Sequence, residues 1–224
     1  MSRYLYKLIQ QGEHGQQDFK FCINDSKKIA ITLSAFANTN GGRLLIGVKD
    51  NGKIAGISSD EEFYMIESAA QIYSRPVIHF TTQQHQTKGK TVLEITIVPG
   101  NKKPYLAQNH NGKWLAYTRI NDENVLAHPI QIEAWKKQRN PQGIYFSYAD
   151  NERLLINYLQ KHTAITLAEF MQLARISRKQ AGDIFSNFMV FNILQIHTLT
   201  DKTFFTLNPD FDKQELTFLK ETHK

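Results

Sequence analysis

A glycine pair separates a predicted helix from a predicted strand, and this order restricts the fold more than any other feature of the chain. The stretch Ala35–Ile57 reads AFANTNGGRLLIGVKDNGKIAGI and contains five glycines. Phosphate-binding loops place their glycines after a strand and before a helix, where the helix N-terminus supplies free N–H groups. Here Gly41 and Gly42 follow the helix instead, and Gly42 is followed by Arg43 and Leu44 in place of the Lys and Ser/Thr of a phosphate-binding loop. The pattern argues against a Walker-type ATPase and predicts a helix C-cap with a left-handed glycine.

Helical and strand patterns alternate along the first part of the chain. Apolar residues at helical spacing predict helices at 5–9, 26–37, 58–73 and 128–137. Alternating or apolar runs predict strands at 17–22, 43–48, 77–82, 91–98 and 114–120. The tetrapeptide DNGK predicts a type I′ hairpin turn on Asn51 and Gly52. These elements predict a mixed sheet with helices packed on it.

A turn-rich segment, RNPQG at residues 139–143, marks the predicted domain boundary. Beyond it the patterns predict helices at 151–161, 167–174 and 177–190, then two strands joined at TDK, residues 200–202. Three helices and a hairpin in this order are typical of a winged helix-turn-helix domain. The predicted fold is α+β, with a first domain at 1–138, a linker at 139–149, a winged helix domain at 150–208 and a tail at 209–224.

The positive charge of the chain is unevenly distributed. The formal net charge is +6. Residues 1–143 hold 18 Lys and Arg against 12 Asp and Glu, whereas residues 144–224 hold 9 against 9. A basic domain attracts polyanions, of which nucleic acid is the commonest. The alternative interpretation, an ordinary solvated surface, stays open because the lysines form no tight run.

Several classes of protein are excluded by composition. The only cysteine is Cys22, which excludes an internal disulfide and a multi-cysteine zinc site and favours a reducing compartment. The histidines lack metal-ligand spacing, and no serine-elbow motif is present. No apolar run approaches the roughly 18 residues of a membrane span, and the N-terminus has no signal-peptide pattern. These observations predict a cytoplasmic protein without a membrane partner.

The glycine-rich stretch is also part of a longer motif. Together with GEHGQQDFKF at 12–21 and AYTRINDENVLAHP at 116–129, it resembles the AlbA_2 domain, also called the Schlafen AlbA-like domain. The resemblance covers residues 8–137. Bacterial members of this family often carry a C-terminal winged helix and are described as DNA-binding proteins or transcriptional regulators. The resemblance therefore implies nucleic acid, either DNA or structured RNA, as the partner.

The same resemblance implies a set of carboxylates. Schlafen-type nucleases use a Glu, a second Glu five residues on that is followed by an aromatic residue and Lys, and an Asp near the hairpin. In this chain Glu13, Asp18 and Asp50 occupy these positions, and Lys20 is the lysine. Asp18 departs from the family pattern, because its side chain is one methylene shorter than Glu. The resemblance implies that the three carboxylates hold Mg²⁺ or Mn²⁺ and that Lys20 offsets charge on a phosphate.

The residues alone leave two interpretations of this set open. Asp18 and Lys20 lie two apart on a predicted strand and therefore project from the same face, where converging carboxylates would suit a hard divalent ion. In that case the three carboxylates are predicted to lie within about 8 Å of one another. Alternatively, Glu13 flanks the first helix, Asp18 and Lys20 form a surface ion pair, and Asp50 belongs to an ordinary turn.

Candidate nucleic-acid contacts come from both predicted domains. Arg119 matches a family arginine at the end of a strand and is predicted to contact phosphate or to pair with Asp122 or Glu123. A helix-turn-helix motif presents the early residues of its second helix to the major groove, and SRKQ at 177–180 opens that helix here. The candidate residues are Lys49, Lys102, Lys103, Arg119, Arg175, Arg178, Lys179, Gln180 and Lys202.

Three functions are compatible with these patterns. The leading prediction is a nucleic-acid-binding protein that acts as a DNA-binding transcriptional regulator. The second is a metal-dependent, Schlafen-type endonuclease acting on RNA or DNA, and the third is a non-catalytic protein-interaction module. Schlafen-type cores contain two AlbA-like lobes and this chain has sequence for one, so a homodimer joined through its neutral C-terminal domain is also predicted.

Overall fold

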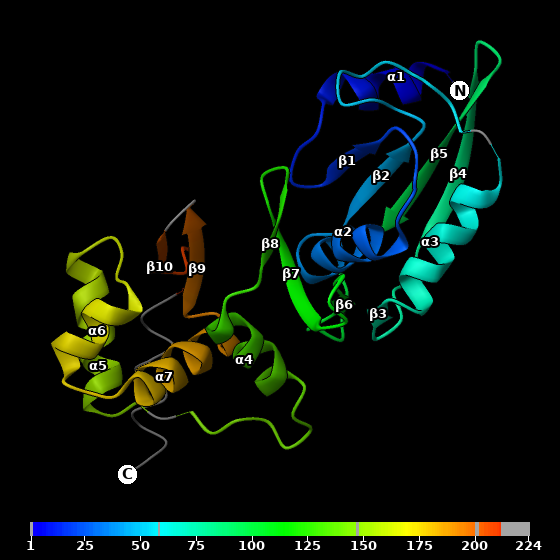
Figure 1. Ribbon diagram of the computed structural model, residues 1–224. Helices are drawn as coiled ribbons and strands as arrows, with labels where there is room; N and C mark the ends of the chain where they lie inside the picture. The colour runs from blue at the N-terminus through cyan, green and yellow to red at the C-terminus, as the bar shows by residue number, and fades with distance from the viewer. Residues whose placement is uncertain (1, 58, 147, 200–201, 212–224) are drawn as a thin grey trace. The chain divides into compact units, whose positions relative to one another are not determined.

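The chain folds into two compact units, Met1–Ala127 and His128–Lys224. The computed structural model describes residues 2–57, 59–146, 148–199 and 202–211. Figure 1 shows the elements of each unit, which are described separately below. The α+β class expected from the sequence is confirmed.

The first unit is built around a four-stranded sheet with the strand order β1-β2-β5-β4. Its strands are β1 (Gln17–Lys20), β2 (Gly42–Ile46), β4 (Thr81–Thr87) and β5 (Lys90–Ile97). β1 and β2 are parallel, and the other pairs are antiparallel. Helix α1 (Ser2–Gln11) lies on one face, and α2 (Ser26–Asn38) with α3 (Glu61–Gln71) lies on the other (Figure 1).

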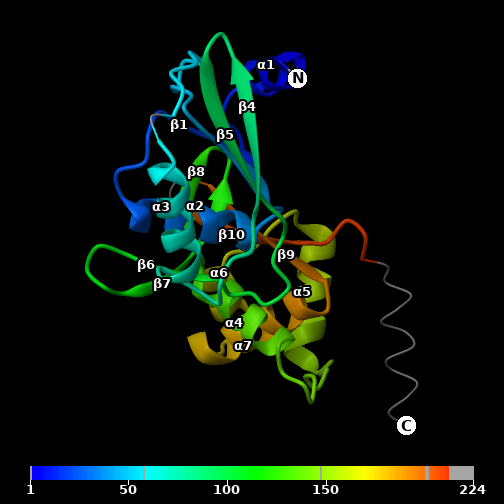
Figure 2. The ribbon, with the colours of Figure 1, turned by 90° about the vertical axis from the view of Figure 1, so that its right-hand side faces the viewer.

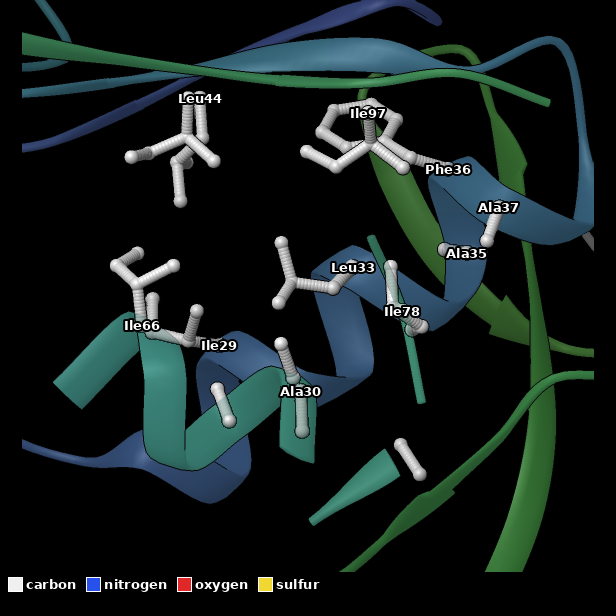
Figure 3. Packing of buried hydrophobic residues seen from close by; sticks show 14 of the residues in the cluster. Ile29, Ala30, Leu33, Ala35, Phe36, Ala37, Leu44, Ile66, Ile78 and Ile97 are labelled. Atoms are coloured by element: carbon white, nitrogen blue, oxygen red, sulfur yellow. The ribbon is translucent and has the colours of Figure 1, made fainter. Parts of the chain in front are cut away.

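A second, antiparallel sheet lies against the other side of α2. Its strands, in the order β3-β6-β7-β8, are β3 (Ser74–Arg75), β6 (Leu106–Gln108), β7 (Trp114–Ile120) and β8 (Glu123–Leu126). Figure 3 shows the core around α2, where Leu33 and Phe36 are fully buried. At the end of this helix, the Asn38 side-chain amide donates to the carbonyls of Tyr105 (2.8 Å) and Tyr117 (2.9 Å). α2 is therefore the element that joins the two sheets.

The predicted glycine C-cap is confirmed at Gly41, and a second glycine allows a close approach of the backbone. Gly41 has a φ of +70°, and its N–H donates to the carbonyl of Phe36 at 3.0 Å, which ends α2. A Cβ atom on Gly47 would lie 2.8 Å from the backbone of Gly56, so the chain can pass this closely only without a side chain. The glycines shape the path of the backbone.

The predicted turn and one predicted strand differ from the structure. The Gly52 N–H donates to the Lys49 carbonyl. Of Asn51 and Gly52, the two residues predicted at the centre of the turn, only Gly52 has a positive φ. The turn is therefore centred on Asp50 and Asn51, whereas a type I′ turn requires two positive φ values. Of the strand predicted at 77–82, only residues 81 and 82 are in a strand, as the start of β4, and β3 lies before this range. β6 and β8 were not predicted because each is only three or four residues long.

The second unit contains four helices and a hairpin among its described residues. These elements are α4 (Pro129–Gln138), α5 (Asp150–Lys161), α6 (Leu167–Ala174), α7 (Arg178–Val190), β9 (Leu194–Leu199) and β10 (Lys202–Leu207). Ile165, in the segment between α5 and α6, forms an isolated antiparallel bridge with Phe205 of β10. The predicted helices and strands of this part are confirmed, while Thr200 and Asp201 of the predicted turn and residues 212–224 of the predicted tail lie outside the described residues.

The boundary between the units lies eleven residues before the predicted end of the first domain, because α4 packs with the second unit. Ile130 is buried in the core of that unit, and Lys137 Nζ donates to Ser186 Oγ (2.7 Å) and Asn187 Oδ1 (2.8 Å) on α7. Within the predicted linker, Phe146 and Tyr148 also pack against this core. The segment after α4 is therefore part of the fold.

The new boundary also changes the charge balance. The first unit holds 15 Lys and Arg against 11 Asp and Glu, a net charge of +4. The second unit holds 12 against 10, a net charge of +2. Positive charge is thus present in both units, and the second unit is not neutral.

Removing α4 should unfold the second unit. We expect the fragment 128–224 to unfold cooperatively on heating, whereas the fragment 139–224 should show no cooperative transition. The shorter fragment loses the burial of Ile130 and the bonds of Lys137, together about 3–5 kcal/mol. Circular dichroism during thermal melting checks this, and equal melting temperatures for the two fragments would contradict it.

Candidate functional site

The predicted acidic residues lie on and beside β1, at one edge of the four-stranded sheet. Phe19 packs with Leu5 and Leu45 on the face that α1 covers. Side chains alternate along a strand, so Asp18 and Lys20 project from the opposite face, as predicted. Asp18 is only 4% exposed, which is unusual for a carboxylate and requires partners.

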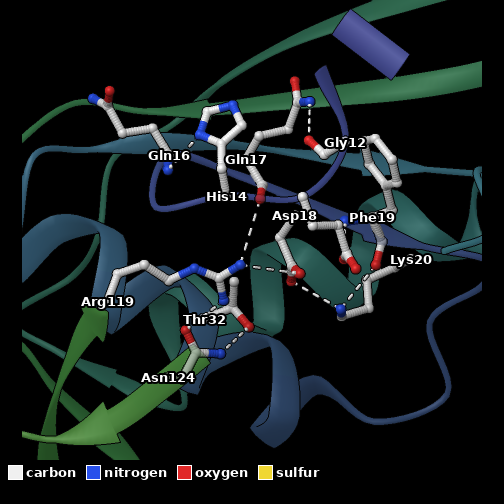
Figure 4. Close-up of polar contacts among 11 residues, drawn as sticks. Gly12, His14, Gln16, Gln17, Asp18, Phe19, Lys20, Thr32, Arg119 and Asn124 are labelled. Carbon is white, nitrogen blue, oxygen red and sulfur yellow. Dashed lines mark hydrogen bonds and ion pairs between the residues drawn. The ribbon is translucent and has the colours of Figure 1, made fainter. Parts of the chain in front are cut away.

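Two basic side chains pair with Asp18, as Figure 4 shows. Arg119 Nη2 lies 3.3 Å from Asp18 Oδ1, and Lys20 Nζ lies 2.8 Å from Asp18 Oδ2. The side chain of Arg119 is 2% exposed, whereas that of Lys20 is 37% exposed. The carboxylate is therefore held between one buried cation and one that reaches the surface.

Arg119 also connects several elements of the first unit. Its Nη1 donates to Asn124 Oδ1 on β8 at 3.0 Å, and its Nη2 lies 3.4 Å from the Gln17 carbonyl on β1. Asn124 Nδ2 in turn donates to Thr32 Oγ1 on α2 at 2.9 Å. The guanidinium lies 5.2 Å from the ring centroid of Phe36, at cation–π distance. This arrangement fixes Arg119 between the two sheets.

Glu13 approaches β1 from the loop that follows α1. Its Oε1 accepts a hydrogen bond from the Phe19 N–H at 2.9 Å. Burial raises the pKa of the Glu13 carboxyl, and hydrogen bonding to Asp18 and the charge of Asp18 act in the same direction. The Phe19 N–H and Lys20 oppose this shift of the pKa. Glu13 and Asp18 are therefore neighbouring carboxyl groups.

Together these side chains close the free edge of β1. The Gln17 N–H and carbonyl pair with His14, the Phe19 N–H is bound by Glu13, and the Phe19 carbonyl accepts from Lys20 Nζ at 2.8 Å. Unpaired edge strands are sites of unwanted strand pairing, and covering them prevents it. We call Glu13, Asp18, Lys20 and Arg119 the edge network. Its visible role in the structure is to satisfy and block this strand.

Asp50 does not join Glu13 and Asp18. It is exposed in the turn after β2, and a Cβ on Gly52 in the same turn would lie 3.0 Å from Ile9 of α1. The turn is thus on the α1 side of the sheet, whereas Asp18 projects from the other side. In the part of the chain that the structure describes, no group of three His, Cys, Asp or Glu side chains could hold a metal ion. The predicted three-carboxylate centre is therefore not formed.

Two of the predicted nucleic-acid contacts have structural partners instead. Arg119 is buried in the edge network and pairs with Asp18, not with Asp122 or Glu123, so phosphate cannot reach it in this conformation. Lys103 Nζ donates to the carbonyl of Thr39, the C-cap residue of α2, at 3.2 Å, and burial lowers the pKa of its amine. Both residues serve the fold of the first unit.

The other predicted contacts of the first unit are accessible. Lys102 is exposed in the loop before β6. Lys49 is exposed, and its Nζ lies 5.1 Å from the ring centroid of Phe21, which is itself 52% exposed. An exposed aromatic ring beside a lysine is suited to contact with nucleic acid, although most such pairs are solvated surface.

The predicted contacts of the second unit gather around the start of α7. Arg175 ends α6 in the left-handed conformation with a φ of 53°, and Ser177 caps α7 two residues later. Arg178 and Lys179 follow in the first turn, and both are exposed. Gln180 Oε1 accepts from the Ser177 N–H and hydroxyl, so this oxygen is engaged in a capping box. Lys202 is exposed at the start of β10.

A buried polar cluster on the α1 side of the sheet was not predicted. His85 Nε2 lies 2.7 Å from Glu94 Oε2, and Arg43 Nε lies 3.2 Å from Glu94 Oε1. Tyr4 of α1 donates to the same Glu94 oxygen at 3.2 Å. The sequence carried little signal for this cluster, because β4 reads TTQQHQT, without alternation of apolar and polar residues.

The fold and this site define an α+β domain in which one helix joins two sheets and an edge strand carries a buried, ion-paired aspartate. Residues 13–128 match the family described as Schlafen, AlbA_2. This match covers more than half of the 224 residues, so the chain belongs to the Schlafen AlbA_2 family.

Two solved structures are similar to part of the chain. The DIP2311 protein from Corynebacterium diphtheriae is 16% identical with a TM-score of 0.42, and the match covers 63% of this chain and 33% of that chain. The N-terminal domain of an ATP-dependent DNA helicase RecG-related protein from Nitrosomonas europaea is 24% identical with a TM-score of 0.41, covering 56% of this chain and 95% of that chain. The chain thus spans about a third of the length of the Corynebacterium protein. No curated protein matches it.

None of the helices within the described residues is both long enough and apolar enough to cross a membrane.

Replacing Glu13 with glutamine should stabilise the first unit at neutral pH. The pKa of Glu13 is raised above 4.5 in the folded state, so its contribution to stability is fully present below about pH 4.5 and is lost as the pH rises through the folded value. Glutamine resembles the protonated form and keeps an acceptor for the Phe19 N–H. We expect a melting temperature about 2–5 °C above the wild type at pH 7, with the difference disappearing near pH 4.

Trp114 fluorescence in a Trp135→Phe background reports this transition, because Trp114 is the only tryptophan of the first unit. Glu123→Gln removes an exposed carboxylate on β8 and serves as the matched control. A Glu13→Gln variant that melts below the wild type at pH 7 would contradict the prediction.

Proposed function

We propose that the protein binds DNA through α7, that its second unit is a winged helix-turn-helix domain, and that it acts as a transcriptional regulator. The observation that carries this proposal is the junction of α6 and α7. α6 ends at Ala174 and α7 begins at Arg178, so a three-residue turn joins them. This is the length of the turn in a helix-turn-helix motif.

The charges around this junction support the proposal. Arg175 lies in the turn and Arg178 and Lys179 lie in the first turn of α7, and all three side chains are exposed. The N-terminal end of a helix carries partial positive charge, which adds to the attraction for phosphate. The first turn of the second helix is also the part that reaches base edges in the major groove.

The strands of the second unit support the winged-helix assignment. β9 and β10 follow α7 directly as an antiparallel hairpin, and Phe205 of β10 also pairs with Ile165 between α5 and α6. A three-stranded arrangement of this kind accompanies the helices of a winged helix. In the proposed complex the exposed Lys202, at the start of β10, contacts the DNA backbone.

The exposed basic residues of the first unit extend the proposal. Lys49 and Lys102 add positive charge to a unit whose net charge is +4. In the proposed complex they contact phosphates and contribute affinity without sequence preference. A homodimer would present two copies of α7 to two half-sites of the DNA.

A second candidate function is metal-dependent cleavage of RNA or DNA, and the observation in its favour is the neighbouring pair Glu13 and Asp18. A bound Mg²⁺ or Mn²⁺ would offset the proximity of these two carboxyl groups. The remaining residues do not fit such a centre. Arg119 and Lys20 already form ion pairs with Asp18, and Asp50 lies on the other side of the sheet. We therefore derive no catalytic step for this site.

One binding experiment separates these functions. Fluorescence anisotropy of the full-length protein with labelled duplex DNA, single-stranded DNA and a structured RNA, with and without Mn²⁺, measures affinity and cleavage together. We expect duplex DNA to bind without metal and to weaken steeply as salt is raised. Metal-dependent cleavage that Asp18→Asn abolishes would support the nuclease instead. If no probe binds at low salt, both nucleic-acid functions are excluded and a protein-interaction module is the remaining function.

A further inference from the structure

The two edges of the four-stranded sheet differ in how they end. At one edge, the backbone groups of β1 are bound by His14 and by the edge network. At the other edge lies β4, the seven-residue strand Thr81–Thr87. Among the described residues, no backbone group of β4 has a hydrogen-bond partner outside its ladder with β5. One edge is closed by side chains and the other is open. Figures 1 and 2 show β4 as the outermost strand at its end of the sheet.

The turn that joins β4 and β5 shows which backbone groups are free. Lys88 and Gly89 both have positive φ, as in a type I′ turn, so the flanking residues Thr87 and Lys90 face each other. Because hydrogen-bonded and non-hydrogen-bonded pairs alternate along an antiparallel ladder, the backbone N–H and C=O groups of Thr82, Gln84 and Gln86 point away from β5. Thr91 of β5, which lies opposite Gln86, confirms this assignment. Its carbonyl accepts from the Ile57 N–H and therefore points away from β4.

The sequence of β4 contains none of the usual protection of an open edge. It reads TTQQHQT, with no charged residue and no proline, and all its side chains except His85 and Thr87 are exposed. Natural edge strands are normally blocked by lysine, proline, a bulge or a covering segment. A neutral, polar strand of this length favours pairing with another strand through its backbone.

Contacts on the covered face attach β4 to β5 and α1. His85 is 2% exposed and pairs with Glu94 of β5 at 2.7 Å. Thr87 Oγ1 lies 3.3 Å from the hydroxyl oxygen of Tyr6 on α1. A strand fixed in this way loses little conformational freedom when a partner binds.

We propose that β4 is a dimerisation edge, at which β4 of a second copy of this chain pairs antiparallel about a two-fold axis at Gln84. In this register Gln84 lies opposite its own copy and Thr82 lies opposite Gln86, so the three outward-facing residues of each chain meet those of the other. The strand is neutral, so self-pairing brings no like charges together. The two sheets would form one continuous eight-stranded sheet.

A second copy is the occupant that the structure favours for two reasons. First, a strand of glutamine and threonine offers no side-chain pattern that distinguishes another partner from itself. Second, pairing between identical edges closes after two copies, and the blocked β1 edge prevents further addition. The inference goes beyond DNA binding, and it places the dimer contact in the first unit rather than in the second unit expected from the sequence.

A disulfide test examines the proposed register. In a Cys22→Ser background, Gln84→Cys places two thiols opposite each other with Cα atoms about 5.5 Å apart, within the range of a disulfide. Thr81→Cys is the matched control, because its two copies would be offset by about 20 Å along the strands. We expect mild oxidation to yield a covalent dimer of the first variant and none of the second. Equal cross-linking of both, or of neither, would overturn the register and the edge.

Mass in solution tests the dimer itself. Light scattering at about 50 µM should give twice 25.8 kDa for the wild type and 25.8 kDa for Gln84→Pro. Proline removes an N–H that is free within the monomer, so it is tolerated on an open edge while blocking cross-chain pairing. Gln84→Thr keeps the N–H and should remain dimeric.

The outcomes of this second test are distinct from those of the DNA experiment, because no nucleic acid is present. A wild-type mass of 25.8 kDa, or a folded Gln84→Pro variant that stays dimeric, would overturn the proposal. Circular dichroism establishes whether Gln84→Pro is folded. If it is not, the Gln84→Cys and Thr81→Cys pair decides.

Discussion

Replacing Arg119 with alanine should lower the free energy of unfolding of the first unit by about 3–5 kcal/mol, the largest stability change we expect from a single substitution. The side chain is 2% exposed, and its removal leaves Lys20 as the cationic partner of the buried Asp18 carboxylate among the described residues. The Gln17 carbonyl and the Asn124 side chain also lose a donor. Urea unfolding followed by Trp114 fluorescence in the Trp135→Phe background measures the change.

Two further variants separate the ion pair from general packing. Arg119→Met with Asp18→Asn removes both charges, and this double variant should be more stable than Arg119→Ala because it leaves no buried carboxylate without its buried counter-ion. Lys113→Ala removes an exposed cation just before β7 and should change stability by less than about 0.5 kcal/mol. A loss below about 1 kcal/mol for Arg119→Ala would show that the buried pair contributes little.

Removing the two basic residues that open α7 should have the largest effect on binding. We expect Arg178→Ala with Lys179→Ala to weaken duplex DNA binding by about 10–100-fold, because each residue provides a phosphate or base contact. The slope of log affinity against log salt should fall by about 2, since about 0.9 is lost for each phosphate contact. Fluorescence anisotropy at several salt concentrations measures both quantities.

The control for this experiment is Lys161→Ala, which removes an exposed lysine in the last turn of α5. It lowers the charge of the second unit without changing the α6–α7 junction, so its effect should be below about threefold. Unchanged affinity in the double variant, or an equal loss in the control, would show that α7 does not contact the DNA.

Local signals in the sequence predicted the elements that depend on neighbouring residues. Gly41 ends α2 in the left-handed conformation because a side chain is unfavourable there. Ser177 begins α7 because its hydroxyl accepts from the Gln180 N–H in a capping box. The strand phase of Asp18 and Lys20 was likewise predictable, because alternation along β1 is a local property.

Features that depend on distant contacts were not predictable in the same way. Arg119 and Asp18 are 101 residues apart in sequence, and only the closing of the second sheet onto α2 brings them together. The helical pattern of α4 was clear, yet its assignment to the second unit depends on Lys137 reaching α7. Asp50 matched a family position, but the geometry of its turn placed it on the other side of the sheet from Asp18.

The closure of the β1 edge changes how relatives of this protein should be compared. A substitution at Asp18, Lys20 or Arg119 would expose backbone groups of β1 or leave a charge unpaired, so natural selection for folding alone would preserve these residues and a hydrogen-bond acceptor at position 13. Their retention through evolution would then record the demands of the fold, even in lineages that never cleave a nucleic acid. Positions that the fold does not require, such as Asp50, are the ones whose conservation can distinguish nucleases from inactive homologues.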